Sequence, residues 1–102
     1  MSVKSRNNVQ CYGSGPASML FAHGFGCDQS MWRLVAPAFA ERFKVITFDL
    51  VGSGGSDRNA YDRAKYASLQ GYADDILEIV EEFAQAAHLR LIGPAPEFPV
   101  QV

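Results

Sequence analysis

The stretch that decides the fold is Met19-Leu20-Phe21-Ala22-His23-Gly24-Phe25-Gly26. Its first half is a continuous apolar run between turn residues, which is typical of a strand buried on both faces of a sheet. Its second half places two glycines where that strand ends, so the backbone there can approach another molecule without a Cβ in the way. Backbone N–H groups in such a turn can point at a developing negative charge. The stretch therefore predicts a buried strand that leads into a loop suited to stabilising an anion.

Size and composition limit the classes of protein to which the chain can belong. It has 102 residues, 48% of them hydrophobic, and a formal net charge of −2, which fits one small globular domain. The nearly balanced charge argues against nucleic-acid and membrane partners. No apolar run approaches the length of a membrane span or the core of a secretory signal. Cys11 and Cys27 form no disulfide or zinc pattern, so we expect a cytoplasmic protein without metal or cofactor.

Four segments carry the pattern of a strand. Residues 9–12 form a short mixed run before a Gly-Ser-Gly-Pro turn, and residues 19–22 form the apolar run already described. Residues 44–48 are β-branched and aromatic and end at Asp49. Residues 89–92 form the last run. Because helical patterns alternate with these strands, the order predicts an α/β fold with a mostly parallel sheet and flanking helices.

Two segments carry the pattern of a helix. Asp28 or Ser30 can cap the first, which is predicted to continue to about residue 40. Pro37 lies inside this pattern, so the helix is either kinked there or begins later than Asp28 suggests. The second is predicted from about Leu69 to Ala87. Its apolar residues form one stripe: Tyr72, Ile76, Ile79, Val80, Phe83 and Ala87. Its solvent-exposed face is predicted to hold five acidic residues: Asp74, Asp75, Glu78, Glu81 and Glu82.

Two nucleotide-binding motifs can be tested against the glycine-rich segment 52–57. A phosphate loop requires a lysine after the glycines, and none follows at that spacing. A dinucleotide loop of the type Gly-x-Gly-x-x-Gly requires a glycine where this segment has Asp57, and a helix that begins there. A tight surface turn is the plain interpretation. His23 and Cys27 are also a conceivable nucleophile pair, although no third group is in place to orient the imidazole.

Together these motifs resemble the α/β-hydrolase superfamily. The His-Gly-Phe-Gly turn after the first apolar strand is followed, one helix and one strand later, by Asp49-Leu50-Val51-Gly52-Ser53-Gly54-Gly55-Ser56. That segment resembles the family's Asp-x-x-Gly-x-Gly-x-Ser loop. Segments 24–30, 35–39 and 71–75 narrow the resemblance to the branch that contains a bacterial energy-stress regulator and the plant karrikin and strigolactone receptors. The resemblance covers about residues 6–84.

The resemblance implies a chemistry and a set of site residues. In that family a Ser-His-Asp triad attacks an ester or lactone held in an apolar pocket. Two backbone N–H groups hold the oxyanion, one of them on the residue that matches Phe25, whose ring is expected to face the pocket. The residues expected to support this loop are His23, Gly24, Gly26, Asp49, Gly52 and Gly54.

The chain departs from the family at the nucleophile. The family's serine lies in Gly-x-Ser-x-Gly, yet no serine follows Ser68. Either Ala95 occupies the serine's place, or the segment that carries it is lost near residues 84–89 and residues 85–102 are a rejoined or divergent tail. The sequence thus predicts one truncated domain, residues 1–102, with no catalytic residue of its own and little activity alone.

Other roles remain open at this point. The chain is also compatible with a non-catalytic binding or regulatory module that holds a small apolar ligand, or with a truncated product that has no selected function. Because a sheet of about four strands with two helices leaves one face and one edge poorly covered, we expect self-association or pairing with a complementary fragment.

Overall fold

The structure is a computed structural model that describes residues 1–84 and 89–93 and the backbone of residues 100–101. The candidate nucleophile position Ala95 lies outside these residues. In chain order the elements are α1 (Val3–Arg6), β1 (Gln10–Gly13), β2 (Ala17–Phe21), η1 (Gln29–Trp32), η2 (Ala36–Phe39), β3 (Phe43–Thr47), η3 (Arg58–Ala60), η4 (Lys65–Ala67), α2 (Leu69–Phe83), β4 (Leu89–Ile92) and β5 (Val100–Gln101), where η marks a 3-10 helix.

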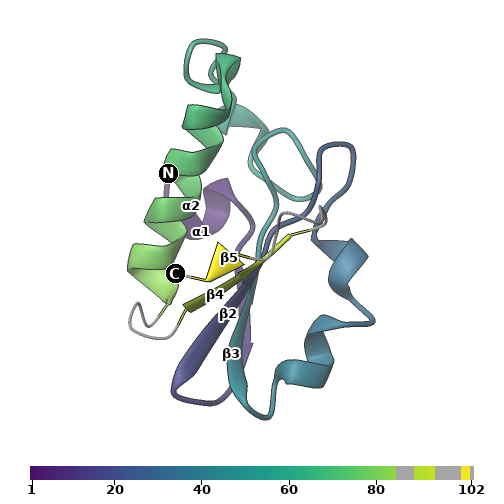
Figure 1. The fold of residues 1–102 in the computed structure, drawn as a ribbon. Helices are drawn as coiled ribbons and strands as arrows, with labels where there is room; N and C mark the ends of the chain where they lie inside the picture. Colours follow the sequence, from purple (N-terminus) through teal and green to yellow (C-terminus); the bar gives the residue numbers. More distant parts are fainter. Residues whose placement is uncertain (85–88, 94–99, 102) are drawn as a thin grey trace.

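The strands form one mostly parallel sheet, as predicted. Their order is β1-β3-β2-β4-β5. Figure 1 labels four of them, β3, β2, β4 and β5, side by side in this order. The central strand β2 runs parallel to β3 and to β4, with Leu20 opposite both Ile46 and Leu91. The outer strands β1 and β5 run antiparallel to their neighbours. All four predicted strands are therefore present, and the parallel centre brings the carboxyl ends of β2 and β3 to the same edge of the sheet.

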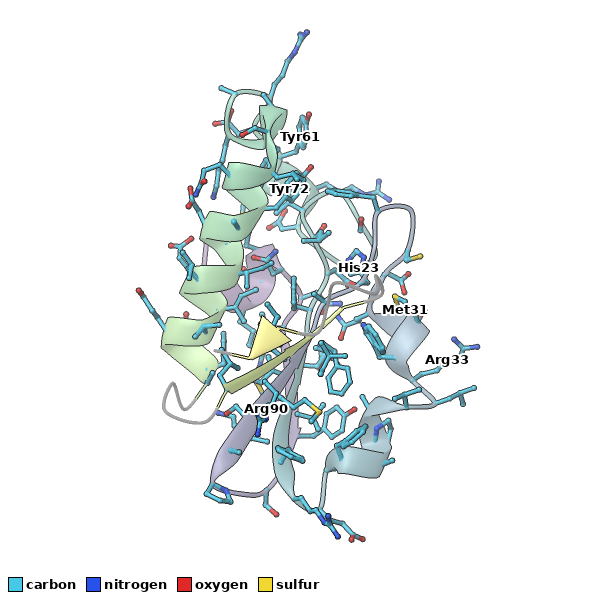
Figure 2. All side chains as sticks on the ribbon, viewed as in Figure 1. His23, Met31, Arg33, Tyr61, Tyr72 and Arg90 are labelled. Carbon is cyan, nitrogen blue, oxygen red and sulfur yellow. The ribbon has the colours of Figure 1, made fainter. Side chains whose placement is uncertain are left out.

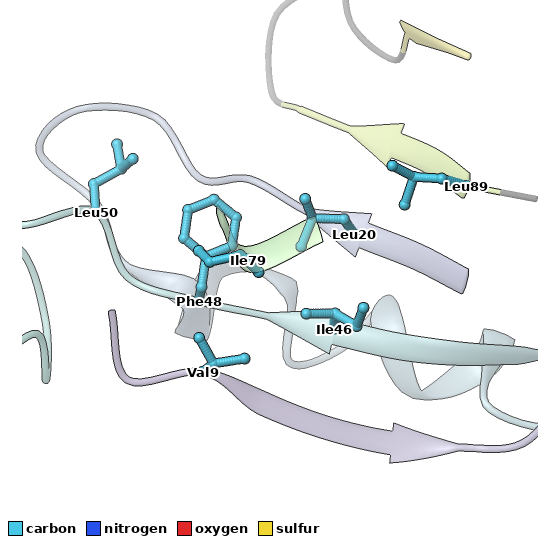
Figure 3. Close-up of a cluster of buried hydrophobic side chains, with 7 residues drawn as sticks. All are labelled: Val9, Leu20, Ile46, Phe48, Leu50, Ile79 and Leu89. Carbon is cyan, nitrogen blue, oxygen red and sulfur yellow. The ribbon is translucent and has the colours of Figure 1, made fainter. Parts of the chain in front are cut away.

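The larger apolar core lies between the sheet and α2. Figure 3 shows its seven buried side chains, which come from the strands, the segments that follow them and α2: Val9, Leu20, Ile46, Phe48, Leu50, Ile79 and Leu89. The predicted stripe of α2 packs against this cluster, and Ile79 at its centre is 0% exposed. Burial of a side chain of this size contributes about 1.5–3 kcal/mol to folding, so this face anchors the helix.

The other face of the sheet corrects one prediction. Instead of one kinked helix from residue 28 to residue 40, the chain forms the two short turns η1 and η2. Asp28 does cap the first, since its carboxylate accepts from the Ser30 N–H at 2.8 Å. Pro37 has no N–H to donate and lies at the start of η2, where it prevents a continuous α-helical ladder. These turns cover a smaller core of Met19, Phe21, Ala36 and Val45.

Helix α2 corrects a second prediction. Asp74 lies on the exposed side, as expected, but Asp75 is only 1% exposed and belongs to the buried side. The apolar periodicity could not reveal this, because the groups that compensate its charge come from other elements, Arg6 from α1 and Lys65 and Tyr66 from η4. The predicted last turn of the helix, residues 85–87, lies outside the described residues. Among the residues described, no helix is both long and apolar enough to cross a bilayer.

Candidate functional site

Two loops meet where β2 and β3 end, and His23 joins them. His23 follows β2 and is 4% exposed (Figure 2). Its Nε2 accepts the Leu50 N–H at 2.9 Å, which fixes the neutral tautomer with the proton on Nδ1, 2.8 Å from the carbonyl oxygen of Gly24. Both ring nitrogens are therefore engaged by backbone, and the imidazole makes no pair with Cys27. The sequence analysis expected His23 to support the loop after β2, and in the structure its ring contacts the backbone of both loops.

Asp49 is the second link between the loops. Its carboxylate is 1% exposed and accepts three hydrogen bonds, from Gln29 N at 2.8 Å and from Asn8 Nδ2 and Gly55 N at 2.9 Å. All three donors are neutral, so the buried charge is stabilised by hydrogen bonds alone. One carboxylate thus joins the segment before β1, the segment after the His-Gly-Phe-Gly turn and the glycine-rich loop.

The glycines of the two loops fit this arrangement. Gly26 and Gly52 have φ of +85° and +93°, with open space where a Cβ would be. Gly54 has φ of +50°, and a Cβ there would lie 2.6 Å from the Asp49 carboxyl group. Only glycine lets the loop approach the carboxylate closely enough for the neighbouring Gly55 N–H to bind it.

Sequence reasoning missed three polar residues of this cluster. Asn7 is 0% exposed and donates from Nδ2 to the Asp49 carbonyl at 2.9 Å. Gln29 donates from Nε2 to the Asn8 carbonyl at 2.9 Å and accepts from Thr47 Oγ1 at 2.5 Å. Asn7 and Asn8 lie in a polar stretch before a short strand and carry no recognisable motif. Only their hydrogen bonds to Asp49, about 40 residues further along the chain, reveal their role.

Phe25 presents both a backbone donor and an aromatic ring at this edge. The turn is closed by a hydrogen bond from Cys27 N to the Gly24 carbonyl at 3.1 Å. Within the part of the chain that the structure describes, the Phe25 N–H donates to no acceptor. The ring is 63% exposed and meets Tyr72 edge-on at 5.2 Å between centroids. A free N–H next to an exposed aromatic ring is an arrangement that could hold an anionic oxygen and an apolar group together.

An anchored row of tyrosines supports the Phe25 ring. Tyr72 packs on Tyr66 at 4.8 Å, and Tyr66 stacks on Tyr61 at 5.8 Å. Figure 2 shows Tyr61 and Tyr72 near the start of α2. The Tyr66 hydroxyl donates to the buried Asp75 carboxylate at 2.6 Å, so the row is fixed to the helix at its centre.

The Asp75 carboxylate is held by two cations as well as by this hydroxyl. Lys65 Nζ lies 2.7 Å and the Arg6 guanidinium 3.4 Å from its Oδ1 atom. The hydrogen bond from Lys65 to Asp75 raises the pKa of Lys65. Burial, followed by the bond to Asp75, raises the pKa of Tyr66. The network therefore keeps a protonated lysine and a neutral tyrosine beneath the aromatic row.

Two clefts flank the loops. The β1 cleft, of about 550 Å³, lies between β1 and the η turns and is lined by Gln10, Tyr12, Trp32, Ala36, Thr47 and Asp49 among others. The loop cleft, of about 560 Å³, lies between the two glycine-containing loops and is lined by Gly26, Cys27, Arg33 and Gly54 among others. Phe25 lines neither cleft. Its ring lies against Tyr72 instead.

The described residues contain no group of three or more His, Cys, Asp and Glu side chains placed to hold a metal ion. The glycine-rich segment 52–57 is engaged in holding Asp49 and in internal turns, among them Ser53 N to the Leu50 carbonyl at 2.9 Å. It therefore serves as a structural loop, which agrees with the plain interpretation as a turn.

A parallel sheet with these two loops at the ends of neighbouring strands defines the α/β-hydrolase class. The model of the alpha/beta hydrolase family matches residues 19–96, and the chain belongs to that family. The match begins at Met19 in β2 and includes both loops and α2.

Named relatives support this assignment. A karrikin insensitive 2 receptor from Petunia hybrida is 41% identical over 79% of this chain and 30% of its own length. A strigolactone esterase from Pisum sativum is 45% identical over 72% of this chain and 28% of its own length. A hydrolase from Oleispira antarctica, 42% identical, matches the structure with a TM-score of 0.79 over 90% of this chain and 33% of that one. The chain therefore spans about a third of the length of these relatives.

Proposed function

We propose that this chain is the N-terminal portion of a serine-type α/β hydrolase for small apolar esters or lactones, and that it does not hydrolyse them efficiently alone. The observation that carries this proposal is the N–H of Phe25, which donates to no acceptor among the described residues and lies on a loop that His23 and Asp49 hold in place. A donor without a partner, on a fixed loop, is ready to bind an oxyanion without reorganising.

The missing nucleophile limits what this donor can do. In enzymes of this class the second oxyanion donor is the N–H of the residue after the nucleophilic serine. No serine follows Ser68 in this chain, so neither the attacking hydroxyl nor that second donor has a place in the sequence. Without a nucleophile, triad enzymes keep only the residual rate that comes from binding and from the oxyanion hole.

The substrate class follows from the surroundings of the donor. The Phe25 ring is exposed and supported by Tyr72, so an apolar acyl or lactone ring could lie on it while its carbonyl oxygen approaches the N–H. Relatives are named as a strigolactone esterase and as karrikin receptors, which agrees with a small apolar ligand.

The exposed ring also favours a second candidate, a non-catalytic binding or regulatory module. Such a role requires only the aromatic surface of Phe25, Tyr72 and Tyr61 and no nucleophile. The receptor names among the relatives are compatible with this alternative.

Hydrolysis of p-nitrophenyl acetate and labelling by a fluorophosphonate probe test the first proposal on the purified chain. We expect neither turnover above that of heat-denatured protein nor covalent labelling. Steady turnover would overturn the expected inactivity, and a loss of that turnover in Phe25→Pro but not in Phe25→Ala would assign it to the N–H group.

Binding of coumarin, an aromatic lactone, tests the surface on which both candidates rely. We expect saturable binding that Phe25→Ala weakens at least tenfold. Leu77→Ala is the matched control, because Leu77 is 60% exposed on α2 and lies outside the aromatic row. Equal binding by both variants would remove Phe25 from the ligand surface.

A further inference from the structure

The β1 strand leaves one side of the sheet open to pairing. It is the edge strand next to β3, and all four of its residues are exposed. Figure 3 shows this strand, which follows Val9, at the margin of the sheet. Nothing in the described part of the chain pairs with its outer side. Natural edge strands are usually protected by charges or proline, yet Gln10-Cys11-Tyr12-Gly13 carries neither.

Antiparallel geometry restricts how two such strands can pair. In an antiparallel ladder, every second residue directs its backbone N–H and C=O groups toward the same neighbouring strand. The backbone groups that point away from β3 therefore belong either to Cys11 and Gly13 or to Gln10 and Tyr12. Two identical strands can bond only when outward residues oppose outward residues. The two-fold axis must then lie between the two copies of one residue, so that this residue faces its own copy. Gly13 has φ of +86°, which ends the regular strand and leaves Cys11 as the centre of the usable segment.

We propose that β1 pairs antiparallel with β1 of a second copy of this chain about a two-fold axis through Cys11, which joins the two sheets into one. Cys11 then faces Cys11 of the second copy, and Gln10 faces Tyr12 of the second copy. No charged residue opposes another along the paired segment, so the self-pairing carries no like-charge penalty. An interface of this kind is isologous and closes at the dimer.

The β1 cleft favours a second copy as the occupant of this edge. Gln10 and Tyr12 both line that cleft, so both point to the face of the sheet that carries the η turns. A two-fold axis perpendicular to the sheet keeps the faces aligned, and it brings Tyr12 of the second copy beside Gln10 at the rim of the cleft. The cleft, of about 550 Å³, has room for the phenol ring there, and the same contact is repeated in the other copy.

Substitutions at Cys11 test the register through the oligomeric state. Cys11→Asp places two carboxylates opposite each other across the axis, while Lys4 and Lys44 lie near enough to Cys11 to favour a negative charge in the monomer. We expect sedimentation equilibrium to show a concentration-dependent dimer for the unmodified chain and for Cys11→Ser. For Cys11→Asp we expect the dimer dissociation constant to rise at least tenfold. Circular dichroism verifies that each variant is folded.

Disulfide formation tests the same register independently. Opposed residues in an antiparallel pair have Cα atoms about 4.5–5.5 Å apart, within the range of a disulfide. Diamide oxidises two thiols to a disulfide and is itself reduced. A mildly alkaline buffer is used because partial desolvation of the exposed Cys11 thiol raises its pKa. We expect Cys27→Ser to form a covalent dimer and Cys11→Ser to form none.

Three results would overturn the proposal. The first is a monomer at every concentration from low micromolar to near-millimolar. The second is a dimer that Cys11→Asp leaves as tight as before. The third is cross-linking of Cys11→Ser through Cys27 as efficient as that through Cys11. Each can be obtained with folded protein, so none depends on a variant that fails to fold.

Discussion

Replacing Asp49 by asparagine is expected to loosen both loops at the sheet edge together. The native Oδ1 atom accepts one N–H group, from Gln29, and the Oδ2 atom accepts two, from Asn8 and Gly55. Asparagine has one acceptor oxygen and one NH2 donor. In its better orientation the oxygen takes the Oδ2 position and keeps two bonds, while its NH2 group faces the Gln29 N–H and leaves that donor unpaired.

The magnitude follows from the one bond that is lost. A hydrogen bond to a charged group contributes about 1.5–3 kcal/mol, and a buried polar group left unsatisfied costs about 1–3 kcal/mol. Because Asp49 is 1% exposed, water cannot replace the lost partner. We therefore expect a loss of about 2–4 kcal/mol in the free energy of unfolding, a large share of the roughly 5–15 kcal/mol that stabilises a typical domain.

Urea unfolding measures this loss. Trp32, the single tryptophan, lies in η1 beside the Gln29 contact, so its fluorescence reports on the loops, and circular dichroism reports on α2. The matched control is Asp74→Asn, the same chemical change at an exposed carboxylate whose partner is Gln70. We expect the control to change the free energy of unfolding by less than about 0.5 kcal/mol.

Two outcomes would refute this reasoning. If Asp49→Asn unfolds at the same urea concentration as the unmodified chain, the carboxylate does not hold the loops together. If Asp74→Asn costs as much as Asp49→Asn, the loss reflects net charge and not the buried hydrogen bonds.

Three further perturbations probe other contacts of the same site. Gly54→Ala is expected to cost more than about 2 kcal/mol, because a left-handed φ costs about 1–2 kcal/mol and the new Cβ would lie 2.6 Å from a buried carboxyl group. Gly26→Ala is the control, because its φ of +85° gives the same backbone strain while its Cβ would meet no atom within 4 Å. Equal urea midpoints for the two variants would show that the contact with the Asp49 carboxyl group adds nothing. His23→Ala removes two backbone hydrogen bonds and leaves a cavity, so we expect a thermal-melting loss equivalent to about 2–4 kcal/mol; an unchanged melting temperature would show that the imidazole is dispensable. The pKa values of Tyr66 and Lys65 are raised in the folded chain, which therefore keeps these protons to higher pH than the unfolded chain does. The stability that they contribute is complete below about pH 10 and falls as the pH rises further. Urea titrations from neutral to strongly alkaline pH should show this fall and a shallower one in Tyr66→Phe, and equal slopes would count against the network.

Local patterns predicted much of the fold because the groups that decide it are neighbours in sequence. The apolar run at 19–22 indicates a strand that is buried on both faces of the sheet, and the apolar stripe of α2 indicates a helix with one buried side. The apolar residues of segment 28–40 also have helical spacing. The chain forms the two short turns η1 and η2 there, because Pro37 interrupts the helical hydrogen bonds. Spacing alone cannot distinguish a continuous helix from two 3-10 turns, in which Ala36 is buried but Val35 and Phe39 are exposed.

The polar contacts were less predictable because their partners are distant in the chain. Asp75 looks like a solvent-exposed helix residue until Arg6 and Lys65 are placed beside it. Asn7 and Asn8 look like part of a polar leader until they reach Asp49, more than 40 residues further on. A carboxylate can be buried only where donors converge on it, and convergence is a property of the folded chain.

The sequence by itself determined the family, the mostly parallel sheet and the positions of the His-Gly-Phe-Gly and Asp-x-x-Gly-x-Gly loops, because these depend on residue types at short spacing. Only the tertiary structure decided that His23 and Asp49 hold the two loops together and that the Phe25 ring rests on Tyr72. It also left β1 as an open, uncharged edge. The physical reason is that hydrogen bonding, charge burial and edge exposure depend on which distant segments meet, and no local pattern records that.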